Sequence, residues 1–282
     1  MQRVEPQVAH IASTKLNYAE VARYLKDIGA EEYQLDEGIS DAEQLVIIAG
    51  KACYKSFVAE LNPNVRKVRD DPQVYLDNIH KTGHGSVTEH ASDTFMFWNV
   101  SRVFTHELVR HRIGVAMSQE SLRYVRLTEL QCWLPSCITE NPAAVKIFEE
   151  TFEYLEKRQL ELAELYGIDA MKSFAKKKVL TSAFRRIAPI GLATAIMWTM
   201  NIRTARHIIQ IRTSRFAEEE IRLVFDKVAE IMTEKHPLLF QDFVRLEYEG
   251  IGEWVAEYAA MPYDNEKLKV LVKELELLKS RA

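Results

Sequence analysis

The stretch from Arg110 to Tyr124 is rich in side chains that donate hydrogen bonds. It opens with the triplet Arg110-His111-Arg112, and the further members are Ser118, Gln119, Ser121, Arg123 and Tyr124. Guanidinium groups bind phosphate oxygens in pairs, and glutamine and serine can hydrogen-bond the edge of a heterocycle. The mixture therefore favours binding of a phosphorylated nucleotide. The alternative is a solvated basic helix end, since cations near a helix C-terminus are ordinary.

A second arginine-rich group lies further along the chain, and its members are Asn201, Arg203, Arg206, His207 and Arg212. If residues 202–212 form a helix, Arg203 and His207 share a face, whereas Arg212 is expected to point well away from His207. One helix would then serve two ligands. The isoleucines between these residues indicate a largely buried helix rather than a polar surface helix, and a buried arginine needs a partner.

A third group consists of histidines, with two glutamates nearby, and invites a metal-site hypothesis: His84, His90, His106, His111, Glu89 and Glu107. The segment HELVRH, residues 106–111, resembles a zinc-peptidase helix, but that motif needs histidines four residues apart, and position 110 is arginine. An arginine beside a metal cation is repulsive. No catalytic metal is expected.

Several common catalytic motifs are missing from the sequence. It contains no GxGxxG, no P-loop and no GxSxG pattern. Cys53 has no evident activating partner, and the only base near Ser121 is His111. A Rossmann site, a P-loop kinase and covalent catalysis are therefore not expected.

Composition limits the class of protein. The 282 residues are 47% hydrophobic and carry 37 Lys and Arg against 41 Asp and Glu, a net charge of −4. Such a chain can bury a core, and it is a poor candidate for coating nucleic acid by bulk charge. Cys53, Cys132 and Cys137 have no CxxC spacing, and no leader or membrane span is recognised. A soluble, cytoplasmic protein that uses neither nucleic acid nor membrane is expected.

The first half of the chain predicts elements that lead into the first arginine group. Strands are expected at 8–12, 94–100 and 130–135. A helix from about Asp41, with Ser40 and Glu43 as a capping box, is expected to bury Leu45, Ile48 and Ala49. Asp71 and Pro72 begin a second helix that stops at Gly83, and Ser101 caps a third that carries Phe104, Leu108 and Val109.

The second half predicts longer helices. Asn141 and Pro142 open a helix that ends near Gly167, and a basic helix runs from about Asp169 to Pro189. A strand at 192–200, a helix capped by Asn201 and a helix at 218–235 follow. The tail, at about 265–280, is an amphipathic helix. A few strands among many helices indicate one α+β domain over residues 1–282 with a small mixed or antiparallel sheet flanked by helices.

The two arginine groups together resemble the flavin-dependent thymidylate synthases, whose signature is RHR, a short spacer, then Ser and usually Arg-Tyr. The similarity runs through four pieces in order: GHGSVTEH from Gly83, HELVRHR with SQESLRY, RRIAP, and NIRTARHIIQIRTSRFAEEEIR from Asn201. The resemblance implies a homotetramer with active sites shared between subunits. It also implies reductive methylation of dUMP to dTMP, with FAD as cofactor and with NADPH and 5,10-methylenetetrahydrofolate as co-substrates.

The resemblance also implies which residues bind each ligand. The flavin set is Ser86, Arg110, His111, Arg112, Gln119, Asn201, Ile202, Arg203 and His207. The dUMP set is Glu107, Leu108, Val109, Arg110, Gln119, Glu120, Ser121, Leu122, Arg123, Arg185 and Arg212. Arg212 is the expected catalytic residue: carbon 5 of uracil must become electron-rich, and a cation that stabilises negative charge developing on the N3 and O4 edge helps it to do so.

Two departures from the family pattern stand in the sequence. The spacer between Arg112 and Ser121, IGVAMSQE, is one residue longer than is common, so Ser118 and Ser121 are both candidates for the motif serine, with Ser121 preferred. Phe216 stands where several relatives have histidine. Without the resemblance, an RNA-binding or nucleotide-sensing module and a metal hydrolase remain as alternatives.

Overall fold

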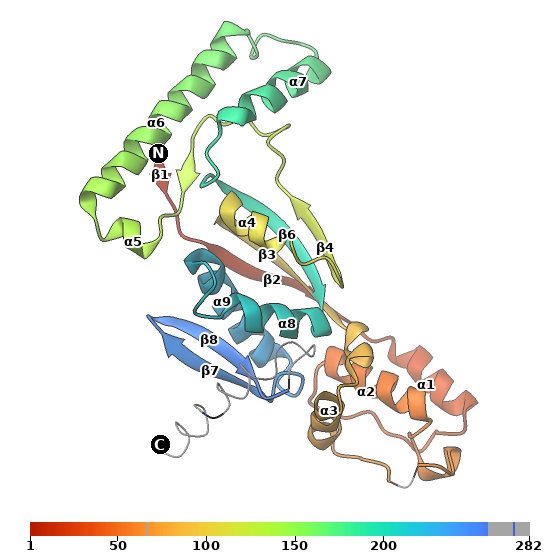
Figure 1. Ribbon diagram of the computed structural model, residues 1–282. Coiled ribbons are helices and arrows are strands. Elements are labelled where there is room, and N and C mark those ends of the chain that lie inside the picture. Colours follow the sequence, from red (N-terminus) through yellow and green to blue (C-terminus); the bar gives the residue numbers. More distant parts are fainter. Residues whose placement is uncertain (66, 259–272, 274–282) are drawn as a thin grey trace.

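The protein is described by a computed structural model that covers residues 1–65, 67–258 and 273. Its centre is a four-stranded antiparallel sheet in the order β2–β3–β6–β4 (Figure 1). The strands are β2 (Gln7–Ser13), β3 (Ser92–Ser101), β4 (Val115–Gln119) and β6 (Ala193–Asn201). The α+β class and the small antiparallel sheet are thus confirmed.

Two smaller pairs of strands lie beside this sheet. The strands β1 (Gln2–Arg3) and β5 (Gln131–Cys132) run parallel, whereas β7 (Phe243–Tyr248) and β8 (Ile251–Ala256) form a hairpin. Glu249 and Gly250, at the tip of the hairpin, have φ angles of 54° and 77°. Positive φ at both turn positions matches the right-handed twist of the two strands.

Helices extend the molecule in two opposite directions from the sheet (Figure 1). At one end lie α1 (Tyr18–Asp27), α2 (Asp41–Tyr54) and α3 (Pro72–Lys81), with the single-turn helix Ala59–Leu61. At the other end lie α5 (Ser136–Thr139), α6 (Pro142–Leu165), α7 (Phe174–Phe184) and the turn Arg185–Ile187. The turn Gly85–Glu89, α4 (Arg102–Leu108), α8 (Ile202–Arg212) and α9 (Glu219–Lys235) lie between them.

The main core lies between the sheet and the helices α4, α8 and α9. Alternate residues of β3 face inward, so Phe95 and Phe97 are fully buried, and they pack with Phe104 of α4 and Phe225 of α9. Trp198 of β6 is also fully buried. Burial of each such ring stabilises the fold by roughly 1.5–3 kcal/mol. These contacts hold α4 and α9 against the sheet.

Two capping residues set the start of the helices that carry the arginine groups. Ser101 Oγ accepts a hydrogen bond from Phe104 N at 3.1 Å, and Asn201 Oδ1 accepts one from Thr204 N at 2.9 Å. Both caps were predicted from the sequence and are confirmed. Ser92 pairs with Asn201 and Ser101 with Ala193. The helices α4 and α8 therefore leave the β3–β6 pair at opposite ends.

Other elements agree with the sequence predictions less completely. The capping box at Ser40 and Glu43 is present, and Asp71 and Asn141 cap helices that open with proline. However, α2 buries Ala42, Val46 and Ile47, while the predicted Leu45, Ile48 and Ala49 are only half-buried. The reason is that α2 lies between two apolar clusters, so no single face is its buried face.

Some boundaries and elements differ outright. The basic helix predicted from Asp169 begins only at Phe174, because Ser173 caps it. The strand predicted at 130–135 shrinks to Gln131–Cys132. The helix α1, the strand β4 and the β7–β8 hairpin were not predicted, and the predicted tail helix falls outside the described residues apart from Lys273. Every helix in the described ranges is too short or too polar to cross a membrane.

Candidate active site

Arg212, the last residue of α8, is held by two residues that come from α4 and the turn after it. Its Nε donates to His111 Nε2 at 2.9 Å, its Nη1 donates to the Glu107 carboxylate at 2.8 Å, and its Nη2 donates to the Glu107 carbonyl at 3.1 Å. The Arg212 and Glu107 side chains are 18% and 30% exposed. A half-buried guanidinium is thus fixed in one orientation at the surface.

The protonation states at this cluster follow from its contacts. Burial, with the charge of Arg212 and the neighbouring His207, lowers the pKa of His111 to about 4. His111 is therefore neutral near pH 7, and since its Nε2 accepts from Arg212, its proton is on Nδ1. Burial lowers the pKa of Arg212, and Glu107 opposes that shift; an arginine nevertheless stays charged.

His207 lies closer to Arg212 than the sequence predicted. Burial first, and then the charge of Arg212, lower the pKa of His207. The rings of His111 and His207 lie edge to face, with their centroids 6.2 Å apart. The prediction that Arg212 points well away from His207 is therefore wrong. A helical projection fixes only the direction of Cβ, whereas the long arginine side chain turns back toward His111, which lies within reach of both.

The first turn of α8 packs against two glycine-containing turns. Asn201 N donates to the Gly114 carbonyl at 2.9 Å, and Thr204 Oγ1 donates to the Ile113 carbonyl at 2.9 Å. Gly114 has a φ of 69°, and a Cβ there would collide with the side chains of Asn201 and Thr204. Glycine is thus required for both backbone conformation and space, and the RHR triplet is joined to α8 through this turn.

Arg203 faces the other turn, Gly85–Glu89. It forms an ion pair with Glu89 at 2.5 Å, while its Nε is buried without a hydrogen-bond partner in the described part of the chain. A Cβ on Gly85 would lie 2.9 Å from that Nε, so the arginine occupies the space that glycine leaves. Ser86 is exposed in the same turn. The predicted flavin residues Ser86 and Arg203 are therefore neighbours.

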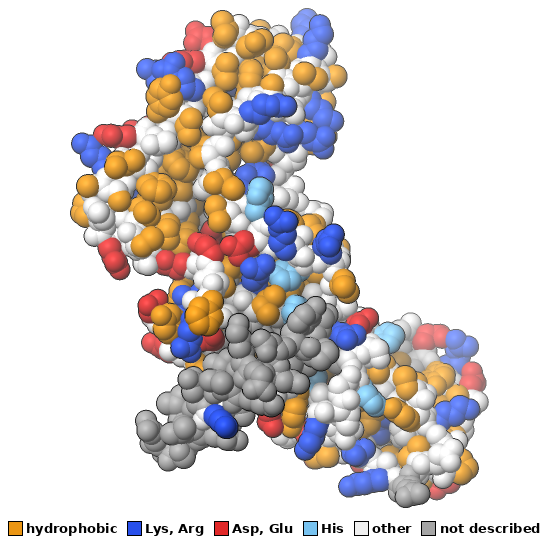
Figure 2. Space-filling view, viewed as in Figure 1, with side chains coloured by type: hydrophobic (Ala, Val, Ile, Leu, Met, Phe, Trp, Pro, Cys, Tyr) orange, Lys and Arg blue, Asp and Glu red, His pale blue; other side chains and the backbone are white. Residues whose placement is uncertain are grey.

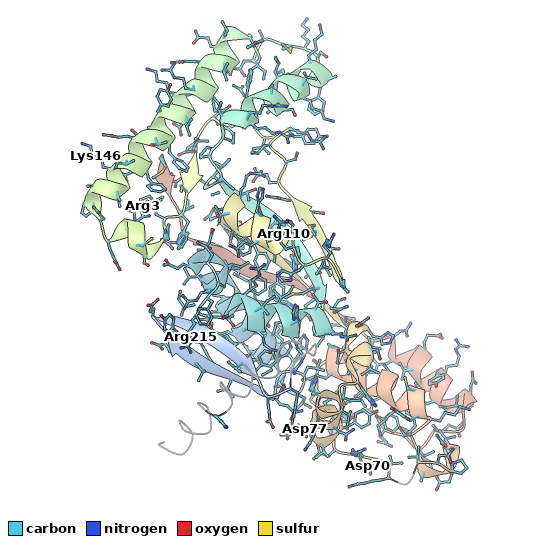
Figure 3. All side chains as sticks on the ribbon, viewed as in Figure 1. Arg3, Asp70, Asp77, Arg110, Lys146 and Arg215 are labelled. Carbon is cyan, nitrogen blue, oxygen red and sulfur yellow. The ribbon has the colours of Figure 1, made fainter. Side chains whose placement is uncertain are left out.

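Arg110 and Arg112 are exposed, and neither forms an ion pair with any described residue. Figure 3 places Arg110 beside α4 and β4, on the side of the sheet where these elements meet. Two unpaired cations flank a neutral histidine and a fixed arginine. This arrangement attracts an anion, because the local charge is not cancelled within the described chain.

The strand β4 brings a second set of predicted residues to α4. Gln119 Nε2 donates to Thr105 Oγ1 of α4 at 3.1 Å, and Arg102 donates to the Glu120 carbonyl at 3.1 Å. Ser121 begins a turn, and its hydroxyl accepts from Arg123 N at 3.4 Å. Ser118 is exposed within β4. Which of the two serines fills the motif role stays a prediction.

Three of the predicted contact residues have buried side chains. Leu108 and Ile202 are fully buried in the main core, and Leu122, 9% exposed, packs in a second apolar cluster around Leu130 and Phe152. Val109 is half-buried. Any ligand contact of the three buried residues would have to come from backbone atoms.

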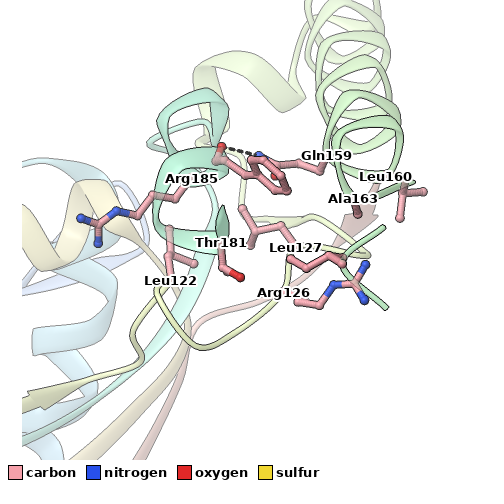
Figure 4. A pocket seen from close by; sticks show the side chains of 10 residues that line it. Leu122, Arg126, Leu127, Gln159, Leu160, Ala163, Thr181 and Arg185 are labelled. Carbon is pink, nitrogen blue, oxygen red and sulfur yellow. Dashed lines mark hydrogen bonds between the residues drawn. The ribbon is translucent and has the colours of Figure 1, made fainter. Parts of the chain in front are cut away.

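Arg185 follows α7 as its C-cap and lines a pocket between α6 and α7 (Figure 4). The pocket is largely apolar, with Leu122, Leu127 and Leu160 in its wall. Figure 4 shows the guanidinium of Arg185 directed away from the other lining side chains. Arg185 is close enough to Arg102 to lower its pKa, although burial is the larger cause. The Arg185 guanidinium therefore points out of this pocket.

The histidines of the metal hypothesis do not come together. Tyr54 and His84 stack with ring centroids 5.8 Å apart, while His111 accepts from Arg212. Among residues 1–65, 67–258 and 273, no three His, Cys, Asp or Glu side chains gather as a metal site would require.

The hydrogen bonds of Arg102, Thr105 and Thr204 were not predicted from the sequence, because single threonines and arginines carry no motif.

Comparisons with known proteins agree on a family. Residues 34–238 match the family model described as thymidylate synthase complementing protein. A flavin-dependent thymidylate synthase of Corynebacterium diphtheriae is 33% identical over 215 residues, 75% of this chain and 83% of that protein. One from Mycobacteroides abscessus is 34% identical over 202 residues, 71% of this chain and 78% of that protein.

A solved structure shares the fold at low sequence identity. The UMP/dUMP methylase from Streptomyces cacaoi, bound with 5-Br dUMP, has a TM-score of 0.60 and 15% identity, over 86% of this chain and 96% of that one. The family model covers the segments that supply Glu107, His111 and Arg212. The chain therefore belongs to the thymidylate synthase complementing protein family, whose curated relatives are flavin-dependent thymidylate synthases.

Proposed function

We propose that this chain methylates dUMP to dTMP at the cluster of Arg212, Glu107 and His111. Methylenetetrahydrofolate supplies the carbon, NADPH supplies the electrons, and tetrahydrofolate is released. The family match and the curated relatives support this reaction. The observation that carries the site assignment is the fixed Arg212 guanidinium beside Arg110 and Arg112, which form no ion pair within the described ranges.

The residues around α8 fit a flavin nucleotide. Arg203 has a buried Nε without a described partner, and glycines at 85 and 114 leave the space that the Arg203 and Asn201 side chains occupy. Arg110 and Arg112 offer charge for a diphosphate, and neutral His111 has a free Nδ1–H. We assign Ser86, Arg110, His111, Arg112, Gln119, Asn201, Ile202, Arg203 and His207 to FAD. The chemistry that bound FAD supplies is the relay of hydride from NADPH to the carbon being transferred.

Arg212 serves the uracil ring in this proposal. Three of its N–H groups are used by His111 and Glu107, which leaves one on Nη1 and one on Nη2. Those two N–H groups can donate to neighbouring acceptors of a planar ring. A positive charge held at the N3 and O4 edge stabilises the uracil anion that forms when N3 loses its proton to solvent, and in that anion carbon 5 is electron-rich enough to attack.

Most of the dUMP assignments come shortly before β4 or shortly after its start, and Arg185 and Arg212 come from later in the chain. We assign Glu107, Leu108, Val109, Arg110, Gln119, Glu120, Ser121, Leu122, Arg123, Arg185 and Arg212 to this nucleotide. Arg123 and Arg185 are exposed cations suited to the phosphate. No cysteine nucleophile is assigned: burial raises the pKa of Cys132 to about 12, so its thiol stays protonated.

We also propose that residues 1–282 act as one domain, and that four copies assemble with shared sites. Large apolar side chains surround the cations and are exposed in the single chain: Ile113, Met117, Ile211 and Phe216 are 73%, 41%, 40% and 89% exposed. A partner subunit would cover them. Sedimentation of the purified protein tests the assembly, and a monomer would contradict it.

The three free cysteines suit the reducing cytoplasm, which we propose as the location of the protein.

The reaction is tested with dUMP tritiated at carbon 5. Purified protein should show a flavin absorption band and release tritium when given NADPH and methylenetetrahydrofolate. Omission of either co-substrate is the control. Absence of both flavin and tritium release would overturn the proposal, whereas flavin without release would place the error in the substrate.

A further inference from the structure

A long segment of the chain carries only positive charge. Residues 170–217 contain ten lysines and arginines and no aspartate or glutamate, although the whole chain has a net charge of −4. Part of this charge gathers on α7, where the space-filling view shows several basic side chains on one face (Figure 2). The nearest acid before the segment, Asp169, forms an ion pair with Arg126. The charge on α7 is therefore open to an external anion.

An aromatic pair lies next to this charge. Tyr124 and Phe174 stack with ring centroids 6.1 Å apart and planes 7° apart, yet they stay 49% and 67% exposed. Lys178 Nζ lies 4.9 Å from the centre of the Tyr124 ring, and the Arg123 guanidinium lies 5.5 Å from it. A hydrogen bond with Lys178 lowers the pKa of Tyr124. Exposed aromatic surface beside cations suits a ligand that is both aromatic and anionic.

The aromatic pair adjoins the candidate nucleotide site. Arg123 precedes Tyr124, and Arg185 follows α7 on the helical face that carries Phe174, Lys177 and Lys178, since these positions are three, four and about seven residues apart. Both arginines belong to the proposed dUMP set. A ligand that reaches from the reaction centre past Arg123 would meet the rings first and the lysines next.

We propose that Tyr124 and Phe174 bind the p-aminobenzoyl ring of the folate co-substrate and that Lys177 and Lys178 bind its γ-linked glutamate tail. The inference rests on the proposed function, because only that reaction brings a folate to the site. A folate presents an aromatic ring followed by carboxylates in the order in which the patch presents rings and cations. Each added glutamate supplies one more carboxylate.

RNA is a weaker match for this surface. Binding of single-stranded nucleic acid uses a series of aromatic side chains along a basic groove. Here one pair of rings stands beside one short helix, on a chain whose overall charge is negative. The shape suits one ring and a short flexible polyanion.

The test compares tetrahydrofolates that carry one or five glutamates. Binding to the FAD-loaded protein with dUMP present is measured by calorimetry for the natural chain, for Lys177→Gln/Lys178→Gln and for Phe174→Ala. The natural chain should bind the longer tail roughly fivefold more tightly, as two exposed ion pairs allow. In the lysine variant this ratio should fall to about one. Phe174→Ala should weaken both ligands by a similar factor, roughly three- to tenfold.

The control is Lys146→Gln/Lys176→Gln, which removes the same charge. Lys146 lies on α6, and Lys176 follows Phe174 by two residues, on the opposite face of α7. This control should keep the natural ratio. Equal binding of both tail lengths by the natural chain would overturn the inference, as would an unchanged ratio in Lys177→Gln/Lys178→Gln.

Two further outcomes are distinguishable. If the lysine variant loses salt-sensitive binding of a single-stranded RNA oligonucleotide while folate binding is unchanged, the patch binds RNA and the inference is wrong. If flavin and tritium release are absent, the proposed function fails, and the same calorimetry on the flavin-free protein then reports whether the tail is bound. Tritium release with no effect of tail length overturns this inference alone.

Discussion

Two arginines on the same helix, six residues apart, differ in almost every physical respect. Arg206 and its partner Asp242 have side chains only 2% and 3% exposed, and the guanidinium also donates to the carbonyls of Leu239 and Tyr258. Arg212 is 18% exposed and keeps two N–H groups unused by His111 and Glu107. Residue type alone therefore says little about role.

The two arginines differ in how many of their N–H groups remain available to a ligand. Four of the five N–H groups of Arg206 donate within the fold, and they join α8 to the segment before β7 and to Tyr258. Arg212 is held firmly enough to keep its direction, yet it retains donors for a partner from outside. A buried arginine paired within the fold cannot be removed without exposing its partner's charge, whereas a half-buried one with remaining donors is suited to chemistry.

The largest expected effect is on the fold. Arg206→Ala leaves the Asp242 carboxylate buried without its cation, and should reduce the free energy of unfolding by about 3–5 kcal/mol. Urea denaturation measures it. The double variant Arg206→Met/Asp242→Leu should recover much of the loss, because no buried charge remains. A loss below about 1 kcal/mol, the value of an exposed pair, would remove the contrast with Arg212.

The next effect is on the reaction. Arg212→Lys keeps the charge but loses the planar donors, and should lower kcat roughly 100-fold or more. Flavin absorbance should be retained, and the free energy of unfolding should change by no more than about 1 kcal/mol. Arg215→Lys, a change of the same kind at an arginine paired with Glu253, should leave kcat unaltered. Equal loss in both variants would contradict the assignment.

A smaller effect should separate the two ends of α8. Arg203→Ala or His207→Ala is expected to weaken flavin binding about tenfold, through loss of contacts to a charged ligand. Flavin fluorescence titration measures the dissociation constant, with Arg215→Ala as the control. If these variants lower kcat without weakening flavin, while Arg212→Lys weakens flavin, the two roles must be exchanged.

Each of the two arginines also has a histidine beside it, which gives a pH test. Burial, assisted by Arg206, lowers the pKa of His80 to about 3, and burial with Arg212 lowers that of His111 to about 4. The unfolded chain takes up these protons near pH 6.5 and the folded chain does not. Stability should therefore fall as the pH drops from about 6.5 toward 4.

Urea denaturation at pH 7 and pH 5 checks the size of this fall. His80→Gln and His111→Gln should each show a smaller loss than the natural chain. His111 should add no acid limb to turnover near pH 6, since it stays neutral there. Identical losses in all three proteins would show that other groups govern the acid sensitivity.

The sequence predicted well those features that depend on local chemistry. Ser101 and Asn201 start their helices as expected, because a cap needs only its own side chain and the next few amides. The strand β4 was not predicted: its residues, VAMSQ, are mostly exposed and show no alternation, and only pairing with β6 makes them a strand. The β7–β8 hairpin was missed because its turn is Glu-Gly and not one of the strong turn pairs.

The site shows the same division. Arg212 and His111 were named from their motifs, yet their contact joins residues 101 positions apart and follows only from the fold, which brings the end of α8 to Glu107 and His111. The faces of α8 were predicted to diverge from the spacing of His207 and Arg212. Helical spacing gives only the direction in which each side chain leaves the helix. It does not show that His111, from another element, contacts both Arg212 and His207.

The length of α8 has a consequence for evolution of the chain. Asn201 fixes where α8 starts and Arg212 must end it beside Glu107, so the number of residues between them is constrained more strongly than their identity. One inserted residue would turn Arg212 by about 100° and shift it by about 1.5 Å. Insertions and deletions in this interval should therefore disrupt the contact of Arg212 with Glu107.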